Sequence, residues 1–181
     1  MTDLSLRVFQ KPDIPELFSW FSSEREVLEW AGAQMPWPLE AREFKRLIKE
    51  HRRKRPTRSL WAVWTQQRMI GHFQLGLNRR LRTIGLGRIG LAPTARGRGL
   101  GHTLVQLALQ QAFSERWAHR VELMVYDHNQ AAIKTYQHAG FVLEGTRRQT
   151  TPIHDEVWDT HIMSLLRPEY KIRFDRRTER E

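Results

Sequence analysis

The segment Arg96-Gly97-Arg98-Gly99-Leu100-Gly101 separates two stretches of different hydrophobic periodicity. Residues 84–91 before it form an apolar, strand-like run, and residues 103–113 after it repeat apolar side chains with helical spacing. Glycines let a backbone approach a bulky anion without clashes from β-carbons. Unpaired N–H groups at the start of a helix, flanked by two arginines, bind phosphate groups well. The segment therefore predicts a strand, a phosphate-binding loop and a helix in direct succession.

The patterns on either side of this loop predict an α/β (α+β) fold with the element order β-α-α-β-β-β-α-β-α-β-β. Strands are expected at about 4–9, 59–65, 69–77, 84–91, 121–126, 141–149 and 157–165. Helices are expected at about 13–21, 40–53, 103–117 and 129–139. The Trp- and Pro-rich stretch 22–39 is expected to be a long, partly ordered loop.

Short links between the middle strands favour an antiparallel meander, and the strand–helix–strand crossover after it adds a parallel pair. We therefore expect a mixed, mostly antiparallel seven-stranded sheet flanked by about four helices. Residues 1–166 are expected to form one domain, followed by a charged C-terminal tail at 167–181.

Composition narrows the class of protein. The net charge of +10 favours polyanionic partners such as a phosphorylated cofactor, although a solvated basic surface explains it equally well. The absence of cysteine excludes disulfides, thiolate metal sites and a cysteine nucleophile, and no histidine spacing suggests a catalytic metal. No apolar run approaches the roughly 18 residues of a membrane span, and no secretory signal is visible. A cytoplasmic protein is expected.

Two other phosphate-binding motifs fail in their sequence context. The Walker motif requires Gly-Lys-Ser/Thr, whereas this chain has Gly101-His102-Thr103 with no lysine. A GxGxxG spacing occurs at Gly85, Gly87 and Gly90, but it lies inside a strand pattern and opens no helix. These glycines are better interpreted as strand irregularities or points of close backbone approach.

The remaining pattern joins Arg96-x-x-Gly99-x-Gly101 to Asn129-Gln-Ala-Ala-Ile-x-x-Tyr136-x-x-x-Gly140-Phe141 about 30 residues later. These motifs, in this order and separation, resemble the GNAT superfamily of acetyl-CoA-dependent N-acetyltransferases over about residues 84–145. The predicted element order extends the resemblance to about residue 166. The Trp- and Pro-rich stretch is similar to the branch that contains ribosomal-protein and small-amine acetyltransferases. The resemblance implies the GNAT fold, acetyl-CoA as cosubstrate and acetyl transfer to a primary amine.

The resemblance also implies which residues hold coenzyme A. The strand end Ile89-Gly90-Leu91 resembles the strand whose backbone pairs with the pantetheine arm. Arg96 matches the residue that opens the pyrophosphate loop of the family. The N–H groups that would hold the pyrophosphate belong to Gly97, Arg98, Gly99, Leu100, Gly101 and His102.

Asn129 and Tyr136 lie on one face of the helix expected at 129–139, at positions i and i+7. The resemblance implies that Asn129 contacts the cofactor where the sheet opens. It implies that Tyr136 contacts the cofactor too and acts as general acid toward the departing thiolate. The alternative is that Asn129 only caps the helix and Tyr136 is an ordinary core aromatic.

The expected general base is missing from its usual place. The resembling branch often carries a glutamate five residues before the asparagine, and this chain has Met124 there. Glu122 lies on the same strand face and is a candidate base, although it also fits a surface ion pair. A water chain is the other candidate. Arg88 stands where related enzymes often have an acidic residue.

Residues of the 22–39 stretch are candidates for binding the acceptor. Glu26 and Glu29 can select an amine, or they are solvated charges. Trp30 and Trp37 can line an acceptor pocket, or they pin the loop to the core.

The leading hypothesis is direct acetyl transfer from acetyl-CoA to an amine of a small molecule or a peptide or protein N-terminus, in a ternary complex. The alternative is a CoA-binding sensor or assembly module with little catalysis. The basic runs lack the interleaved aromatic residues of a nucleic-acid platform, so no specific nucleic acid is expected, and no membrane partner either. Exposed strand edges make a homodimer a further expectation.

Overall fold

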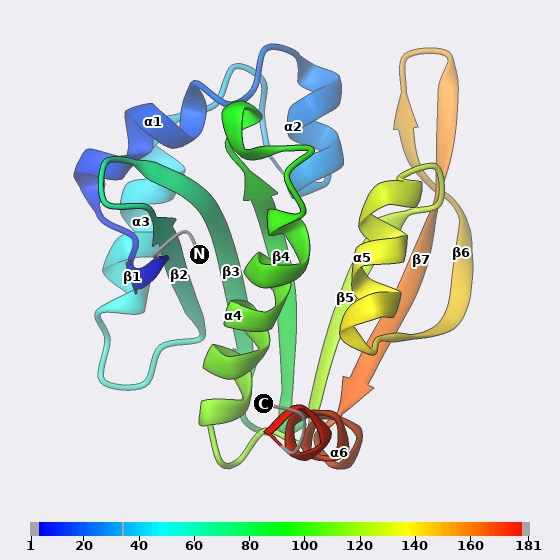
Figure 1. Ribbon diagram of the computed structural model, residues 1–181. Coiled ribbons are helices and arrows are strands. Elements are labelled where there is room, and N and C mark those ends of the chain that lie inside the picture. Colours follow the sequence, from blue (N-terminus) through cyan, green and yellow to red (C-terminus); the bar gives the residue numbers. More distant parts are fainter. Residues whose placement is uncertain (1–3, 34, 179–181) are drawn as a thin grey trace.

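The computed structural model describes the backbone of residues 4–33 and 35–178, and the side chains of those ranges up to residue 172. Across these residues, seven strands form one sheet in the order β1-β2-β3-β4-β5-β7-β6 (Figure 1). The strands are β1 (Ser5–Val8), β2 (Arg58–Trp64), β3 (Met69–Asn78), β4 (Thr83–Leu91), β5 (Arg120–Tyr126), β6 (Val142–Ile153) and β7 (Glu156–Leu166). Neighbours pair antiparallel except β4 and β5, which are parallel. The mixed seven-stranded sheet predicted from the sequence is confirmed.

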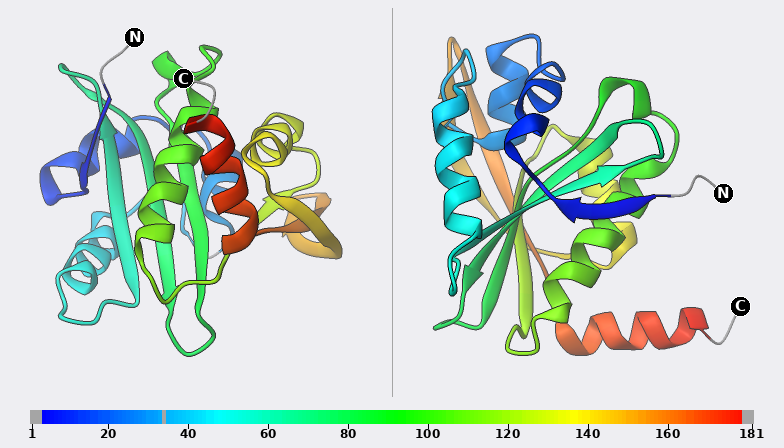
Figure 2. Two further views of the ribbon diagram at one scale, coloured as in Figure 1. Left: turned by 60° about the horizontal axis from the view of Figure 1, so that its bottom comes forward. Right: turned by 90° about the vertical axis from the view of Figure 1, so that its left-hand side faces the viewer.

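Helices cover both faces of this sheet. They are α1 (Ile14–Phe18), α2 (Glu24–Ala31), α3 (Ala41–His51), α4 (Leu100–Ser114), α5 (Gln130–Ala139) and α6 (Arg167–Thr178), with short 3-10 turns at η1 (Lys11–Asp13) and η2 (Pro93–Ala95). α2 and α3 lie on one face, and α4 and α5 lie on the other (Figure 2). Within the described ranges, no helix is both long and apolar enough to cross a membrane.

α4 supplies the apolar stripe that its sequence predicts. Its buried residues are Leu104, Val105, Ala108, Leu109, Ala112 and Phe113. They repeat at helical spacing and form part of the main hydrophobic core. The stripe fixes the rotation of α4 on the sheet. Because α4 begins at Leu100, its first turn lies directly after the glycine loop, close to the end of β4.

The prediction of a loop over residues 22–39 was wrong for its first part, where α2 forms. The Ser23 side chain caps this helix by accepting the Glu26 N–H at 3.3 Å, and Gly32 ends it with a left-handed φ of 74°. Val27 and Leu28 are buried on its inner face. The Ser23-x-x-Glu26 spacing is the N-terminal helix signal that marks this start in the sequence.

The segment after residue 166, expected as a charged tail, forms α6 in the described part of the chain. Its first residue, Arg167, donates hydrogen bonds to the carbonyls of Phe113, Glu115 and Ala118 at 3.1, 2.7 and 2.5 Å. Tyr170 stacks on Phe113 with 4.6 Å between ring centroids. These contacts join α6 to the end of α4.

β4 and β5 pair only over their first residues and then diverge (Figure 1). The parallel ladder ends at Leu86 opposite Leu123, and residues 87–91 have no partner on β5 in the described chain. Arg88 has a left-handed φ of 46°, and the β3–β4 register shifts opposite it. The fully buried His72 donates its Nδ1–H to the Arg88 carbonyl at 2.9 Å. The bulge and this hydrogen bond direct the end of β4 away from β5.

Candidate active site

A cavity of about 320 Å³ opens where β4 and β5 separate. It is lined by Phe21, Glu26, Glu29, Trp30, residues 86–91, Arg96, Met124, Val125, Asn129, Ala132 and Tyr136. Most of the residues predicted for the site are therefore brought together, from α2, β4, the glycine loop and α5, whereas β5 contributes Met124 and Val125. Their convergence on one concave site, with a few polar groups among apolar walls, is typical of a small-molecule binding site.

The glycine loop turns the chain from β4 into α4. Gly97 and Gly99 have left-handed φ values of 72° and 73°, which residues with a β-carbon rarely adopt. Gly99 is the N-cap residue of α4, so the first N–H groups of the helix remain available to an anion. Arg96 donates from Nε to the Leu91 carbonyl at 3.1 Å, which fixes the start of the loop against the end of β4.

A second, more open cavity of about 430 Å³ adjoins the loop on the side of α5. It is lined by Leu91, Arg96, Gly97, Gly99, Leu100, Gly101, His102, Lys134, Thr135 and His138. The loop N–H groups, the positive end of the α4 dipole and the cationic side chains of this cavity suit a phosphorylated ligand.

These features fit the acetyl-CoA that the sequence resemblance implies. The free edge of β4 over residues 87–91 offers unpaired backbone groups to an extended ligand, in the manner of an added strand. The left-handed glycines and the start of α4 follow directly and offer N–H groups to a pyrophosphate.

Asn129 and Tyr136 are held at the wall of the first cavity by α5. The Asn129 side chain accepts the Ala132 N–H at 3.0 Å and caps the helix, so the capping role considered from the sequence is present. Tyr136 is 7% exposed and lies edge-on to Phe141, with ring centroids 5.9 Å apart. Burial raises the pKa of the Tyr136 hydroxyl, which therefore stays protonated at neutral pH.

The structure places Glu122 outside this cavity. Glu122 lies opposite Gly85, in the part of the sheet where β4 and β5 are still paired. Its carboxylate binds Arg120 at 3.0 Å, and Arg120 also pairs with Glu144. Met124, two residues further along β5, lines the cavity instead. The geometry matches the surface ion pair that was the alternative for Glu122.

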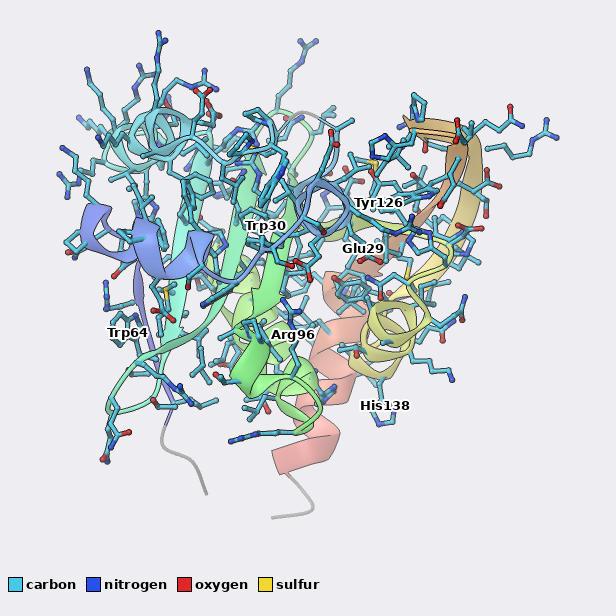
Figure 3. All side chains as sticks on the ribbon, turned by 90° about the horizontal axis from the view of Figure 1, so that it is seen from above. Glu29, Trp30, Trp64, Arg96, Tyr126 and His138 are labelled. Carbon is cyan, nitrogen blue, oxygen red and sulfur yellow. The ribbon has the colours of Figure 1, made fainter. Side chains whose placement is uncertain are left out.

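α2 brings Glu29 and Trp30 over the opening of the sheet (Figure 3), and Glu26 of the same helix lines the cavity with them. The Trp30 ring approaches Gly90 so closely that a β-carbon there would lie 3.2 Å from it. Glu26 accepts the Ser22 N–H at 2.6 Å and the Ser22 hydroxyl at 2.9 Å, and these bonds lower the pKa of Glu26. Glu29 lies 3.2 Å from Nε2 of His128. Trp37 is 40% exposed and does not line this cavity.

α2 also reaches the β6–β7 hairpin on the far side of the opening. Leu28 packs with Tyr126, Ile153 and Trp158 in a separate small core. Arg25 pairs with Glu156 at 2.8 Å. The helix thus bridges the two halves of the sheet above the cavity.

Sequence reasoning did not find the roles of His72 and His128. Neither has a motif around it, and both act through contacts with residues distant in sequence: His72 with the Arg88 carbonyl and His128 with Glu29. Burial lowers the pKa of His72 to about 4, so its ring is neutral and donates through Nδ1.

The splayed strands, the glycine loop and the buried tyrosine are the features expected of an acyl-CoA-dependent acyltransferase site. The chain belongs to the acetyltransferase (GNAT) family, whose model matches residues 24–141. It is an N-acetyltransferase, which transfers an acetyl group from acetyl-CoA to an amine.

Two proteins and one solved structure illustrate the relationship. Spermidine N(1)-acetyltransferase of Vibrio cholerae serotype O1 is 24% identical over 170 residues, which cover 93% of this chain and 96% of that protein. The probable N-acetyltransferase YjcK of Bacillus subtilis is 32% identical over 74 residues, 40% of each chain. A crystal structure of the Vibrio cholerae spermidine N-acetyltransferase with CoA and spermine has a TM-score of 0.79 at 25% identity, and the match covers 92% of this chain and 97% of that chain.

Proposed function

We propose that the cavity between β4 and β5 is where the acetyl group passes directly to a primary amine, with no acyl-enzyme. The observation that carries this proposal is that two adjoining cavities, which share Leu91 and Arg96 in their walls, bring together three features. These are the unpaired edge of β4, the exposed start of α4 after the glycine loop, and the buried hydroxyl of Tyr136. Each corresponds to one requirement of the reaction: binding the thioester arm, binding the pyrophosphate and donating a proton.

Coenzyme A is proposed to lie along residues 89–91, with its pyrophosphate on the N–H groups of residues 97–102. The left-handed glycines and the α4 N-terminus support this placement, and Arg96 and Arg98 add positive charge beside the loop. Asn129 completes the wall at the opening of the sheet while it caps α5.

In this proposal the amine nitrogen attacks the thioester carbonyl carbon, a C–N bond forms and the C–S bond breaks. Acetyl-CoA supplies the activated acetyl group. Tyr136 gives its hydroxyl proton to the departing sulfur. The amine proton passes to a carboxylate or to water. Glu26 and Glu29 are the acidic side chains on the cavity wall in the described residues. The Glu26 carboxylate already accepts two hydrogen bonds from Ser22, so we assign the role of proton acceptor to Glu29, with His128 beside it.

The acceptor is proposed to be a small amine or a peptide N-terminus. The spermidine acetyltransferase relative makes a polyamine one candidate for this chain. We also propose a homodimer, because β1 and β6 are edges of the sheet and Val142 and Leu143 on β6 are exposed. Light scattering after size-exclusion chromatography measures that oligomeric state directly.

The test of the function is amine-dependent thiol release. Purified protein is incubated with acetyl-CoA and a panel of amino acids, polyamines and short peptides, and free thiol is measured. Release that depends on both the protein and an amine is the expected result. Tight CoA binding with no release from any amine would overturn it. That outcome would favour a CoA-binding module, which Met124 at the expected base position keeps as the second candidate.

A further inference from the structure

Arg88 presents an unusual charge at the wall of the cavity. It lies on the bulged part of β4 with a φ of 46°, and it lines the cavity together with the α2 residues. Its Nη1 donates to the Gln74 side-chain oxygen at 3.0 Å, and its guanidinium lies 6.0 Å from the Phe44 ring centroid. A guanidinium has five N–H donors, and the hydrogen bond to Gln74 uses one of them. Within the described residues, most of the Arg88 donors therefore remain for a ligand.

No carboxylate in the described part of the chain pairs with Arg88. The nearby Glu43 carboxylate is already bound by Arg46, at 2.8 and 3.0 Å. Arg58 and Arg46 add like charge around the site. Burial, followed by repulsion from Arg58, lowers the pKa of Arg88 below its ordinary value, but arginine keeps its charge in proteins. The Glu43 carboxylate attracts Arg88 but is not in ion-pair contact with it, so a largely buried guanidinium is only partly compensated, and an anionic ligand in direct contact would relieve the remaining cost.

The cavity also carries the opposite charge. Glu26 and Glu29 line it from α2, and Trp30 of the same helix provides an apolar wall over Gly90. One cavity thus offers carboxylates that suit an ammonium group and a guanidinium that suits an anion. A polyamine would satisfy only the first of these, and would bring a cation toward Arg88.

We infer that the acceptor is an amine that also carries an anionic group, a carboxylate or a phosphate, and that Arg88 binds this group. This inference rests on the proposed function of the cavity. It makes the charge pattern of the acceptor differ from that of spermidine, which the Vibrio cholerae relative is named for. Arginine binds carboxylate and phosphate groups through paired N–H donors, so the site selects for charge and for shape.

The test compares matched acceptors on the wild-type protein. The common L-amino acids and phosphoethanolamine are set against neutral counterparts, in which an amide or a hydroxyl replaces the anionic group. These are the amino-acid amides and ethanolamine, and spermidine is tested beside them. The inference predicts that kcat/KM for the preferred anion-bearing acceptor exceeds that for its neutral counterpart by about 10- to 100-fold. Amino acids and phosphoethanolamine separate the carboxylate from the phosphate. Equal or better transfer to the neutral amines or to spermidine would overturn the inference and leave the proposed function intact.

Two variants then assign the preference to the side chain. Arg88→Gln should remove the preference, whereas Arg88→Lys should keep part of it, and both should bind CoA as the wild-type protein does. Lys45→Gln removes one exposed positive charge from α3 outside the cavity and serves as the matched control. An Arg88→Gln protein that binds CoA normally and keeps the full preference would refute the role of Arg88.

A calorimetric titration keeps the two proposals apart. If no amine releases thiol, the proposed function fails, and binding of the same acceptors to the CoA-loaded protein still decides the subsite. Weaker binding of anion-bearing amines to Arg88→Gln than to the wild-type protein would support the subsite. Equal affinity for anion-bearing and neutral amines would exclude it.

Discussion

Tyr136 has the two properties that a proton donor beside a thiolate needs: a place on the cavity wall and a hydroxyl that burial keeps protonated. Tyr136→Phe removes only that hydroxyl. We expect kcat to fall by about 100-fold, the usual lower range for loss of a general acid, while the dissociation constant for CoA stays within about twofold. Steady-state thiol release and calorimetric CoA titration measure the two quantities.

Tyr126 provides the matched control for this variant. It is a second buried tyrosine, but its hydroxyl bonds to Thr151 at 3.2 Å and it does not line the cavity. Tyr126→Phe should leave kcat nearly unchanged. An equal loss of kcat in the two variants, or a loss of CoA affinity in Tyr136→Phe, would contradict the proposed role.

Position 99 requires glycine because of its backbone conformation, and not because a side chain would lack room. A β-carbon at this position would meet nothing within 4 Å, but the φ of 73° is one that branched residues avoid. Gly99→Val should therefore displace the first N–H groups of α4 and weaken CoA binding by about tenfold or more. Calorimetry or competition binding checks the affinity. Gly145→Val, at an open position on β6 with no positive φ, should bind CoA normally.

At the scale of residues, the sequence predicted the positions of the glycine loop and of Tyr136 better than that of Glu122. The loop and the tyrosine each belong to a short motif in which spacing determines position. Glu122 shows the limit of that reasoning: strand periodicity placed it on the correct face, but not at the correct distance from the opening. The contacts of Arg88 depend on a bulge between Gly87 and Gly90. These glycines predicted an irregular strand there, but not that Arg88 would adopt the left-handed conformation.

The side chain of His72 affects the shape of β4, because its Nδ1–H donates a hydrogen bond to the Arg88 carbonyl at the bulge. Its Nε2 is buried with no partner in the described residues, and burial lowers its pKa to about 4 from an ordinary 6.5. The unfolded chain therefore binds a proton below pH 6.5 that the folded protein does not take up until about pH 4. The stability that neutral His72 contributes is present above pH 6.5 and is lost as the pH falls toward 4.

The full contribution of neutral His72 to the free energy of unfolding is about 3 kcal/mol, and most of it is lost by pH 4.5. Urea unfolding of the wild-type protein at pH 7.5 and pH 4.5 measures it together with the contributions of other groups. The same comparison in His72→Asn, which keeps a donor near the Arg88 carbonyl, should show a decrease in unfolding free energy smaller by about 2 to 3 kcal/mol. The same pH dependence in both proteins would mean that His72 is not held neutral.

At the scale of elements, helices with a long apolar stripe were predictable and short capped ones were not. α4 repeats buried residues at helical spacing over about three turns, which makes its period easy to recognise in the sequence. α2 has only eight residues, and two of its buried residues pack against separate parts of the molecule, Val27 in the main core and Leu28 against the hairpin. Its stability comes from tertiary contacts that the sequence pattern does not display.

At the scale of the whole molecule, charge is distributed unevenly. Positive side chains gather on the outer face of α3 and at its C-cap: Arg42, Lys45, Arg46, Lys49 and Arg52. They line one surface hollow together with Lys11. A net charge of +10 favours encounter with anionic molecules, and a phosphorylated cosubstrate is one of them. This long-range attraction raises association rates and weakens with salt, whereas the proposed selection of the acceptor depends on the charged side chains that line the cavity.

Arg167, the first residue of α6, joins this helix to the end of α4. It donates hydrogen bonds to three carbonyls there, and its guanidinium lies 5.1 Å from the Phe113 ring centroid. Arg167→Met keeps much of the side-chain volume but removes these charge-assisted bonds. We expect the unfolding free energy to fall by about 2 kcal/mol in urea, with kcat/KM at 25 °C unchanged because the contact lies at the opposite end of α4 from the glycine loop. Arg116→Met, which removes an exposed charge nearby, should change stability by less than about 0.5 kcal/mol. A stable Arg167→Met protein would show that apolar packing of Tyr170 on Phe113 is enough to hold α6, and a loss of activity in the folded variant would show that α6 affects the cavity.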